Sequence, residues 1–223
     1  MRSDRPAPVM WLLLLGLMLG LGMGPAKASK GDAQALVDRA EQTLQGFRAD
    51  PDMAWFRKHL PQARGLMIVP QLVKAGFIFG GSGGSGVLLG RTDGGWSMPA
   101  FYDMGSVSFG LQIGGEVAEV MLLIMTQRGM DAMYSTEFKL GADASVAVGP
   151  TGVGAQAATA DVLAFSRSKG AFAGLTLEGA ILAPKDDWNS AYYGRGVRPI
   201  EIVREHAVSN PGANGLIGAL KGR

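Results

Sequence analysis

Short apolar runs separated by glycine residues dominate the chain from residue 65 onward, and they restrict its possible folds more than any other feature. The 223 residues include 34 glycines. Runs this short, joined by turns such as Asp93-Gly94-Gly95, favour antiparallel hairpins over long crossovers. Glycines inside a strand usually mark a bend or a bulge. The pattern predicts a strongly bent, mainly antiparallel, glycine-rich sheet or partial barrel, with strands at 66–69, 77–79, 87–89, 96–101, 107–113, 117–125, 145–148, 162–166, 171–177 and 180–182.

Helical spacing of apolar residues appears in a few segments around this sheet. Between 32 and 47 apolar side chains recur every three or four residues with charges between them, which predicts an amphipathic N-terminal helix. A second short helix is expected at 53–60, because Pro61 then breaks it. Residues 126–134 are a third short candidate, and 199–206 form the predicted C-terminal helix. The expected fold class is therefore α+β.

The first 28 residues have the three-part plan of a secretion signal. Arg2 and Arg5 precede an apolar run at 9–21, and small residues then lead up to Ala28. The run is shorter than the roughly 20 apolar residues of a spanning helix. We therefore predict cleavage between Ala28 and Ser29, with an uncleaved membrane anchor as the alternative. The expected location is the periplasm or outer envelope, peripheral to a membrane.

Composition limits what the exported part can be. Residues 29–208 suit one domain with a single core, and the Gly/Asn/Pro-rich stretch 209–223 is expected to be a flexible tail. The chain has no cysteine, so neither a disulfide nor a lipid-modified N-terminal cysteine is expected. Removing 1–28 reduces the 21 basic and 19 acidic side chains to 18 of each. A formally neutral protein lacks the basic excess typical of nucleic-acid binding.

The glycine series 81–86 matches the spacing of a dinucleotide-binding turn, but such a turn must open a helix. Here Val87-Leu88-Leu89 follows, which is typical of a strand. We therefore do not expect a nucleotide site. Two readings remain: a loop whose backbone amides bind another phosphate, or a tight bend. The loop interpretation includes Gly80, Gly81, Gly83, Gly84 and Gly86.

The possible catalytic motifs of the chain lack the sequence context that catalysis requires. Ser166 and Lys169 have the S-x-x-K spacing of serine acyl enzymes, yet Gly170 follows at once and the neighbouring runs are strand-like. The two histidines, His59 and His206, have no nucleophile near them in sequence, and zinc clusters usually need cysteine. The sequence therefore predicts neither an enzyme nor a cofactor or metal site.

An ordered series of motifs resembles the SYLF-domain family, a lipid-binding module also described as the actin-binding domain of yeast endocytic proteins. The resemblance covers about residues 33–194 and keeps the order of the motifs. They are Lys74-Ala75-Gly76-Phe77, Gly80-Gly81 with Gly83-Gly84-Ser85-Gly86, Gly95-Trp96-Ser97-Met98-Pro99, Phe109-Gly110-Leu111-Gln112-Ile113-Gly114, Phe138-Lys139-Leu140-Gly141-Ala142, Ala147-Val148-Gly149-Pro150, Ser166-Arg167-Ser168-Lys169-Gly170, Phe172-Ala173-Gly174 and Tyr192-Tyr193-Gly194.

The resemblance implies binding of acidic phospholipids, phosphoinositides among the eukaryotic members, and actin binding in some of them. It implies no catalysis. The predicted export signal argues against actin and favours an anionic envelope lipid as the partner.

Two groups of residues are candidates for contacting that lipid. Lys74, Arg91, Arg167 and Lys169 flank glycine-rich turns, where ammonium and guanidinium groups can meet a phosphate. The alternative is that they are solvated turn residues. The segment Trp55-Phe56-Arg57-Lys58 combines aromatic and basic side chains, as membrane-surface elements do. The alternative is a helix that packs its aromatic side chains against the domain.

Two other function classes stay open at this stage. One is a scaffold that self-associates or binds an envelope protein through a sheet edge. The other is a hydrolase whose nucleophile the motifs do not reveal.

Overall fold

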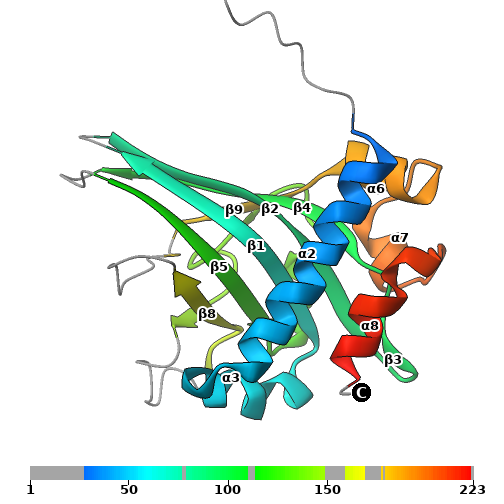
Figure 1. The fold of residues 1–223 in the computed structure, drawn as a ribbon, viewed down its shortest axis with the longest axis horizontal. Helices are drawn as coiled ribbons and strands as arrows, with labels where there is room; N and C mark the ends of the chain where they lie inside the picture. Colours follow the sequence, from blue (N-terminus) through cyan, green and yellow to red (C-terminus); the bar gives the residue numbers. More distant parts are fainter. Residues whose placement is uncertain are drawn as a thin grey trace, which may run out of the picture.

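One nine-stranded sheet organises the computed structural model, which describes residues 28–76, 79–109, 114–148, 159–168, 177 and 179–221. The strand order is β6-β9-β4-β2-β1-β5-β8-β7, and β3 pairs only with β2 (Figure 1). Among the described strands every pairing is antiparallel except β7 with β8. The strands are β1 Gly65–Gly76, β2 Phe79–Thr92, β3 Gly95–Trp96, β4 Ala100–Phe109, β5 Gly114–Ile124, β6 Phe138–Lys139, β7 Val146–Val148, β8 Val162–Ser168 and β9 Ile181–Pro184.

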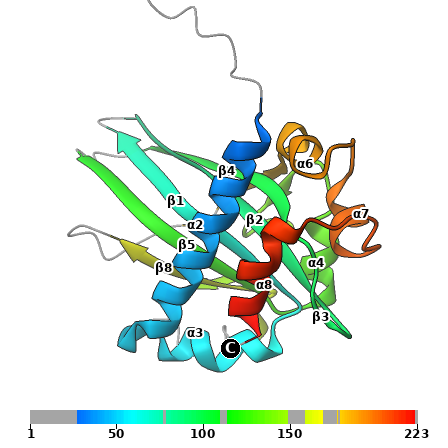
Figure 2. The same cartoon turned by 45° about the vertical axis from the view of Figure 1, so that its right-hand side comes forward.

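Helices surround the sheet, and the longest of them, α2, crosses it diagonally (Figure 1). Ser29 caps the start of α2, because its hydroxyl accepts a hydrogen bond from the Asp32 backbone N–H at 3.0 Å. In Figure 2 α8 lies beside α2 on the same face of the sheet. The helices are α2 Lys30–Ala49, η1 Pro51–Met53, α3 Ala54–His59, η2 Leu60–Gln62, α4 Gln127–Ala132, α6 Asp186–Tyr193, α7 Pro199–Val203, η3 Pro211–Ala213 and α8 Asn214–Leu220.

The two faces of the sheet carry separate hydrophobic cores. One core joins Phe138 of β6 to Ala164 of β8, two strands near opposite ends of the strand order, so this is the concave inner face of the curl. The other core packs strand residues such as Phe101 against α2, α3, α6 and α8 on the outer face. Alternate residues of each strand therefore belong to different cores, as the two-residue period of a strand requires.

The predicted architecture is confirmed: the fold is α+β, and its strongly curled sheet forms a half-barrel with an N-terminal helix and C-terminal helices. Two local expectations were wrong. The glycine series 80–86 is not a loop but lies inside β2, paired to β1 and β4. The described part of the expected tail, residues 209–221, is not frayed, because η3 and α8 form there and bury Leu216 and Leu220 in the outer core.

Among the described residues, no helix combines the length and apolar character needed to cross a bilayer.

Candidate functional site

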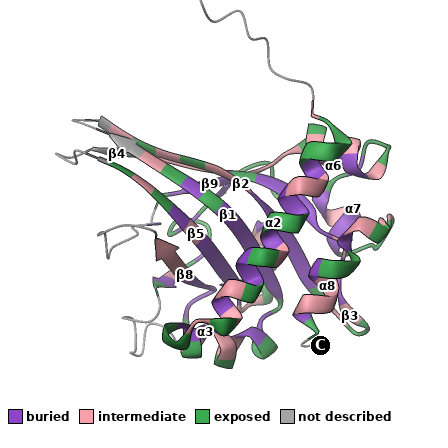
Figure 3. Cartoon of the chain, viewed as in Figure 1, coloured by how far each residue is buried: buried purple, intermediate pink, exposed green. Residues whose placement is uncertain are grey.

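Four strands extend past the helices and end in a thin sheet at one side of the molecule (Figures 1 and 2). We call this part the blade: residues 72–76 of β1, 79–86 of β2, 103–109 of β4 and 114–119 of β5. Figure 3 shows exposed and intermediate residues along the blade, whereas buried residues concentrate where the helices lie over the sheet. The blade thus presents sheet surface that no described helix covers.

A row of aliphatic side chains crosses the outer face of the blade. Cross-strand pairing aligns Val117, Val73, Gly83 and Gly105 on the four blade strands, and the row continues to Ile181 on the neighbouring strand β9. Val73 is 44% exposed, Val117 42% and Ile181 39%. Gly83 and Gly105 have no side chain, so the row has aliphatic side chains at its ends and only backbone in the middle.

The next row adds an even more exposed aliphatic residue. Val107 pairs with Gly81 and is 77% exposed. Among the described residues, five large hydrophobic side chains are exposed, and four of them lie on this outer face. Such clustering differs from the single exposed apolar residues that any protein surface shows.

Ion pairs border this apolar area on the side of the core. Asp103 accepts hydrogen bonds from Ser85 Oγ at 2.5 Å and from Lys185 Nζ at 2.7 Å. Arg167 pairs with Glu119 at 2.6 Å, also on the outer face. An apolar area with a polar border is the usual form of an interaction surface.

The inner face of the blade is polar at the same level. Cross-strand pairing aligns Glu116, Lys74, Ser82 and Ser106 over β5, β1, β2 and β4. All four are half-buried, and the two serine hydroxyl oxygens lie 2.7 Å apart. Deeper in the curl this row gives way to buried apolar residues such as Leu72.

The fold separates the described members of the first group of predicted lipid contacts from one another. Lys74 lies on the inner face of the blade, whereas Arg167 lies on the outer face. Arg91 follows Ser82, the partner of Lys74, by nine residues along β2, a distance of about 30 Å in an extended strand. Lys169 lies outside the described residues.

Arg167 and Arg91 are held by the fold. The guanidinium of Arg167 lies 5.3 Å from the Phe47 ring centroid and also approaches Asp50. Arg91 donates to the carbonyl oxygens of Leu60 and Pro61 at 3.0 and 3.1 Å and stacks on Trp96. Both side chains therefore connect secondary-structure elements, which is the role that favours arginine over lysine at such positions.

The aromatic and basic residues of α3 divide between core and surface. Phe56 is fully buried, with its ring against Phe47 and Phe165, so it does not lie on a surface that lipid can contact. Trp55 is half-buried beside Phe165. Lys58 is exposed. The aromatic side chains of α3 thus pack against the domain, which was the alternative to a membrane-surface element.

Arg57 of α3 is also engaged with the fold: its guanidinium donates hydrogen bonds to the carbonyl oxygens of Arg48, Asp50 and Pro51.

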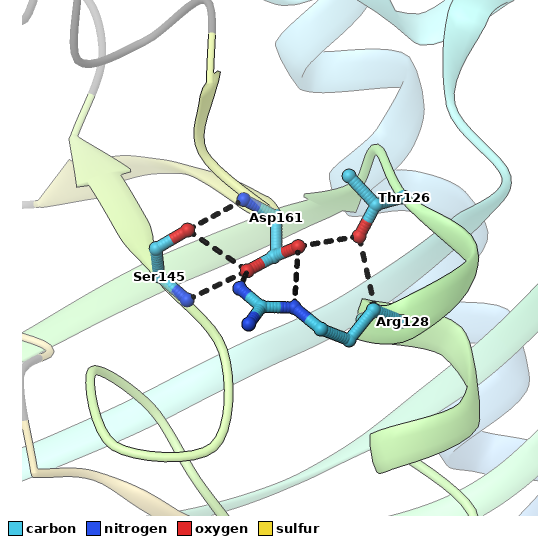
Figure 4. A network of polar contacts seen from close by, with 5 residues as sticks. Thr126, Arg128, Ser145 and Asp161 are labelled. Carbon is cyan, nitrogen blue, oxygen red and sulfur yellow. Dashed lines mark hydrogen bonds and ion pairs between the residues drawn. The ribbon is translucent and has the colours of Figure 1, made fainter.

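A buried carboxylate that sequence reasoning missed forms the densest polar network among the described residues (Figure 4). Asp161 is 3% exposed and accepts hydrogen bonds from Thr126 Oγ1 at 2.6 Å, from the Arg128 guanidinium, and from the backbone N–H and hydroxyl of Ser145. The hydrogen bond from Arg128, followed by those from Thr126 and Ser145, holds the pKa of Asp161 well below its usual range despite burial.

This network is structural. It joins the start of α4 to β8 and to the residue before β7, and the backbone adds a bond from Met125 N–H to the Asp161 carbonyl at 2.7 Å. The acceptor capacity of the Asp161 carboxylate is used by these contacts, so the carboxylate itself is not free to act on a ligand. A sequence signal existed only in Thr126, an N-cap residue placed before a short helix.

Comparisons with known proteins support the resemblance seen in the motifs. A family model described as "Ysc84: Las17-binding protein actin regulator" matches residues 105–223. LAS seventeen-binding protein 3 of Saccharomyces cerevisiae is 35% identical over 176 residues, which cover 74% of this chain and 38% of the yeast protein. SH3 domain-containing YSC84-like protein 1 of Homo sapiens is 31% identical over 163 residues, which cover 70% of this chain and 47% of the human protein.

The chain thus spans less than half the length of these relatives. No solved structure matches it. The family model covers more than half of the chain, and the relatives extend the similarity to about three quarters of it. The chain belongs to the Ysc84 family, whose domain is the SYLF domain that its motif series resembles.

Proposed function

We propose that this protein is a non-catalytic module that binds phospholipid membranes through the outer face of its blade. The observation that carries the proposal is a row of exposed aliphatic side chains on sheet surface that no described helix covers. The row contains Val73, Val117 and Ile181, with Val107 beside it and glycines between them. The ion-paired border of this face limits how deep it enters an apolar medium.

The strength of such an attachment follows from the exposed apolar area. Complete burial of a valine side chain contributes about 1.5 kcal/mol or more. The four aliphatic side chains are already partly covered, so they contribute on the order of 3 kcal/mol together. This value fits reversible binding, which further weak contacts can strengthen.

The charge preference is for anionic lipid, as the family resemblance implies. Lys74 on the blade and Lys58 on α3 form no ion pair among the described residues. Each lysine near an anionic membrane contributes about 1 kcal/mol. We also propose that the signal predicted at 1–28 exports the protein, so that the membrane is one of the cell envelope.

A protein partner is the second candidate. The family description and the names of the relatives refer to binding Las17 and to actin regulation. The same apolar face suits contact with a protein surface, and this alternative makes no use of a bilayer. The two candidates differ in whether the isolated protein binds vesicles.

Vesicle flotation of residues 29–223, which contain every described element, tests the proposal. We expect flotation with vesicles that contain phosphatidylglycerol and weaker flotation with phosphatidylcholine alone. Val73→Ser with Val117→Ser should reduce the bound fraction at least several-fold. Val148→Ser is the matched control, because Val148 is 38% exposed but lies on β7, away from the blade.

Two outcomes contradict membrane binding through the blade. If the wild-type protein stays at the bottom of the gradient with both vesicles, the protein-partner candidate takes its place. If the Val73 and Val117 double variant floats as well as the Val148 control, another surface binds the membrane.

A further inference from the structure

Two opposite charges stand side by side on the inner face of the blade without contacting each other. Lys74 and Glu116 are directly paired across β1 and β5, strands that are about 4.8 Å apart. Neither side chain has a hydrogen bond or an ion pair among the residues that the structure describes. Both are half-buried. The blade thus presents one cation and one anion, one strand apart.

Hydroxyl groups extend this pair on the lysine side. Ser82 is directly opposite Lys74, and its hydroxyl oxygen lies 2.7 Å from that of Ser106. When one serine donates to the other, the second retains a hydroxyl hydrogen for a further acceptor. The row therefore offers donors at Lys74 and the serines and an acceptor at Glu116.

From this arrangement we infer that the inner row binds a headgroup that carries a phosphodiester and a primary ammonium two carbons away, as in ethanolamine and serine phospholipids. Lys74 and a serine hydroxyl bind the phosphate oxygens, and Glu116 accepts hydrogen bonds from the ammonium. The inference rests on the proposed function, since it names the lipid class for which the blade is built.

The charge pattern separates this class from other headgroups. A phosphate without an ammonium, as in phosphatidylglycerol, places its negative charge beside Glu116 with no compensating group. A quaternary choline has no N–H to donate to the carboxylate. Serine phospholipids carry net negative charge as well, so they satisfy both this row and the anionic preference.

The two faces meet this lipid together. Val73 and Lys74 are successive residues of β1, and Glu116 and Val117 are successive residues of β5. Side chains of successive strand residues point to opposite faces at one level. An outer face in contact with acyl chains therefore keeps the inner row at the level of the headgroups.

The experiment uses soluble headgroups, so that it does not depend on membrane insertion. Glycerophosphoethanolamine, glycerophosphocholine and glycerol 3-phosphate are titrated into residues 29–223, and amide shifts of β1 and β5 are followed by NMR. We expect glycerophosphoethanolamine to bind at least about tenfold tighter than the other two, a difference of about 1.4 kcal/mol. The shifts should centre on Lys74 and Glu116.

Isosteric variants assign the two charges. Glu116→Gln should remove the preference for ethanolamine over choline, and Lys74→Gln should weaken binding of all three compounds. Glu205→Gln and Lys30→Gln are controls, because these residues are exposed and lie off the blade. The Val73→Ser and Val117→Ser double variant should bind the soluble headgroup normally while it fails to float.

Equal affinity for the ethanolamine and choline compounds, or no saturable shift with glycerophosphoethanolamine, overturns the inference. A Glu116→Gln variant that still prefers the ethanolamine compound over the choline compound also overturns the inference. If flotation succeeds in these cases, membrane binding through the outer face stands without headgroup selection. If the headgroup binds but the protein does not float, the failure belongs to the proposed function instead.

Discussion

At the scale of single residues, Asp161 shows how a carboxylate is held charged inside a small protein. Burial alone would raise its pKa, yet the contacts with Arg128, Thr126 and Ser145 lower it. Because the folded-state pKa lies below that of the unfolded chain, the ionised group stabilises the fold at neutral pH. That stabilisation is complete above the unfolded value near 4 and is lost as the pH falls through the folded value.

Asp161→Asn tests this role. The amide keeps the shape but loses the charge and places donors toward Arg128 and Ser145, so we expect the free energy of unfolding to fall by about 2 kcal/mol at neutral pH. Urea unfolding followed by circular dichroism measures it. Below pH 4 the wild type should lose stability more steeply than the variant, so the difference between them narrows.

Glu205→Gln is the matched control, since Glu205 is exposed and the substitution is also isosteric. An Asp161→Asn protein as stable as this control at every pH would show that the network does not stabilise the fold.

At the scale of elements, β2 explains why the glycine series is there. A bulge in β1 around Pro70 brings the Gln71 carbonyl oxygen against Gly84 and the Ile68 carbonyl oxygen against Gly86, so a Cβ at either glycine would collide with backbone. At Gly83, in contrast, a Cβ would meet nothing within 4 Å. The glycines of one strand therefore have different causes: close approach of the neighbouring backbone at two of these positions and an open surface at the third.

Alanine substitutions at adjacent positions separate these causes. Gly84→Ala should lower the free energy of unfolding by about 2 kcal/mol or more, because the neighbouring backbone cannot move away cheaply. Gly83→Ala should leave stability unchanged or raise it by about 0.5 kcal/mol, since alanine restricts the unfolded chain. Thermal unfolding of the two variants measures the difference in stability. Equal losses of stability in both would show that close approach of the β1 backbone is not the reason for Gly84.

At the scale of the whole molecule, charge balance bears on the proposed binding to a membrane. Residues 29–223 hold equal numbers of basic and acidic side chains, and the fold engages Arg57, Arg91 and Arg167 internally. Long-range attraction to an anionic surface is therefore weak. In the proposed function, the aliphatic row on the blade therefore supplies most of the free energy of membrane binding.

Salt dependence follows from this balance. Raising the ionic strength to about 1 M shortens the Debye length to about 3 Å and screens surface charges. We expect vesicle flotation to fall by less than about half, because apolar contacts do not weaken in salt. Complete release at high salt would mean that a cationic surface, rather than the blade valines, carries the attachment.

The sequence determined the family and the kind of fold. Motif order from Lys74 to Gly194 indicates the SYLF domain, and helical or glycine-interrupted spacing predicts α2 and the bent sheet, because both signals are local. Local spacing failed at 80–86, where turn-forming glycines form a strand because two neighbouring strands pair with them. Local spacing also failed at 214–220, where tertiary packing orders α8.

Only the tertiary structure decided which residues share a surface. Lys74 and Arg167 both follow strand-like runs in the sequence, yet they lie on opposite faces of the sheet. The physical reason is that side chains alternate along a strand, so a bulge such as that in β1 shifts the pairing and reassigns every residue beyond it. The blade's apolar outer row and its polar inner row each draw residues from several strands, and strand pairing brings these residues together.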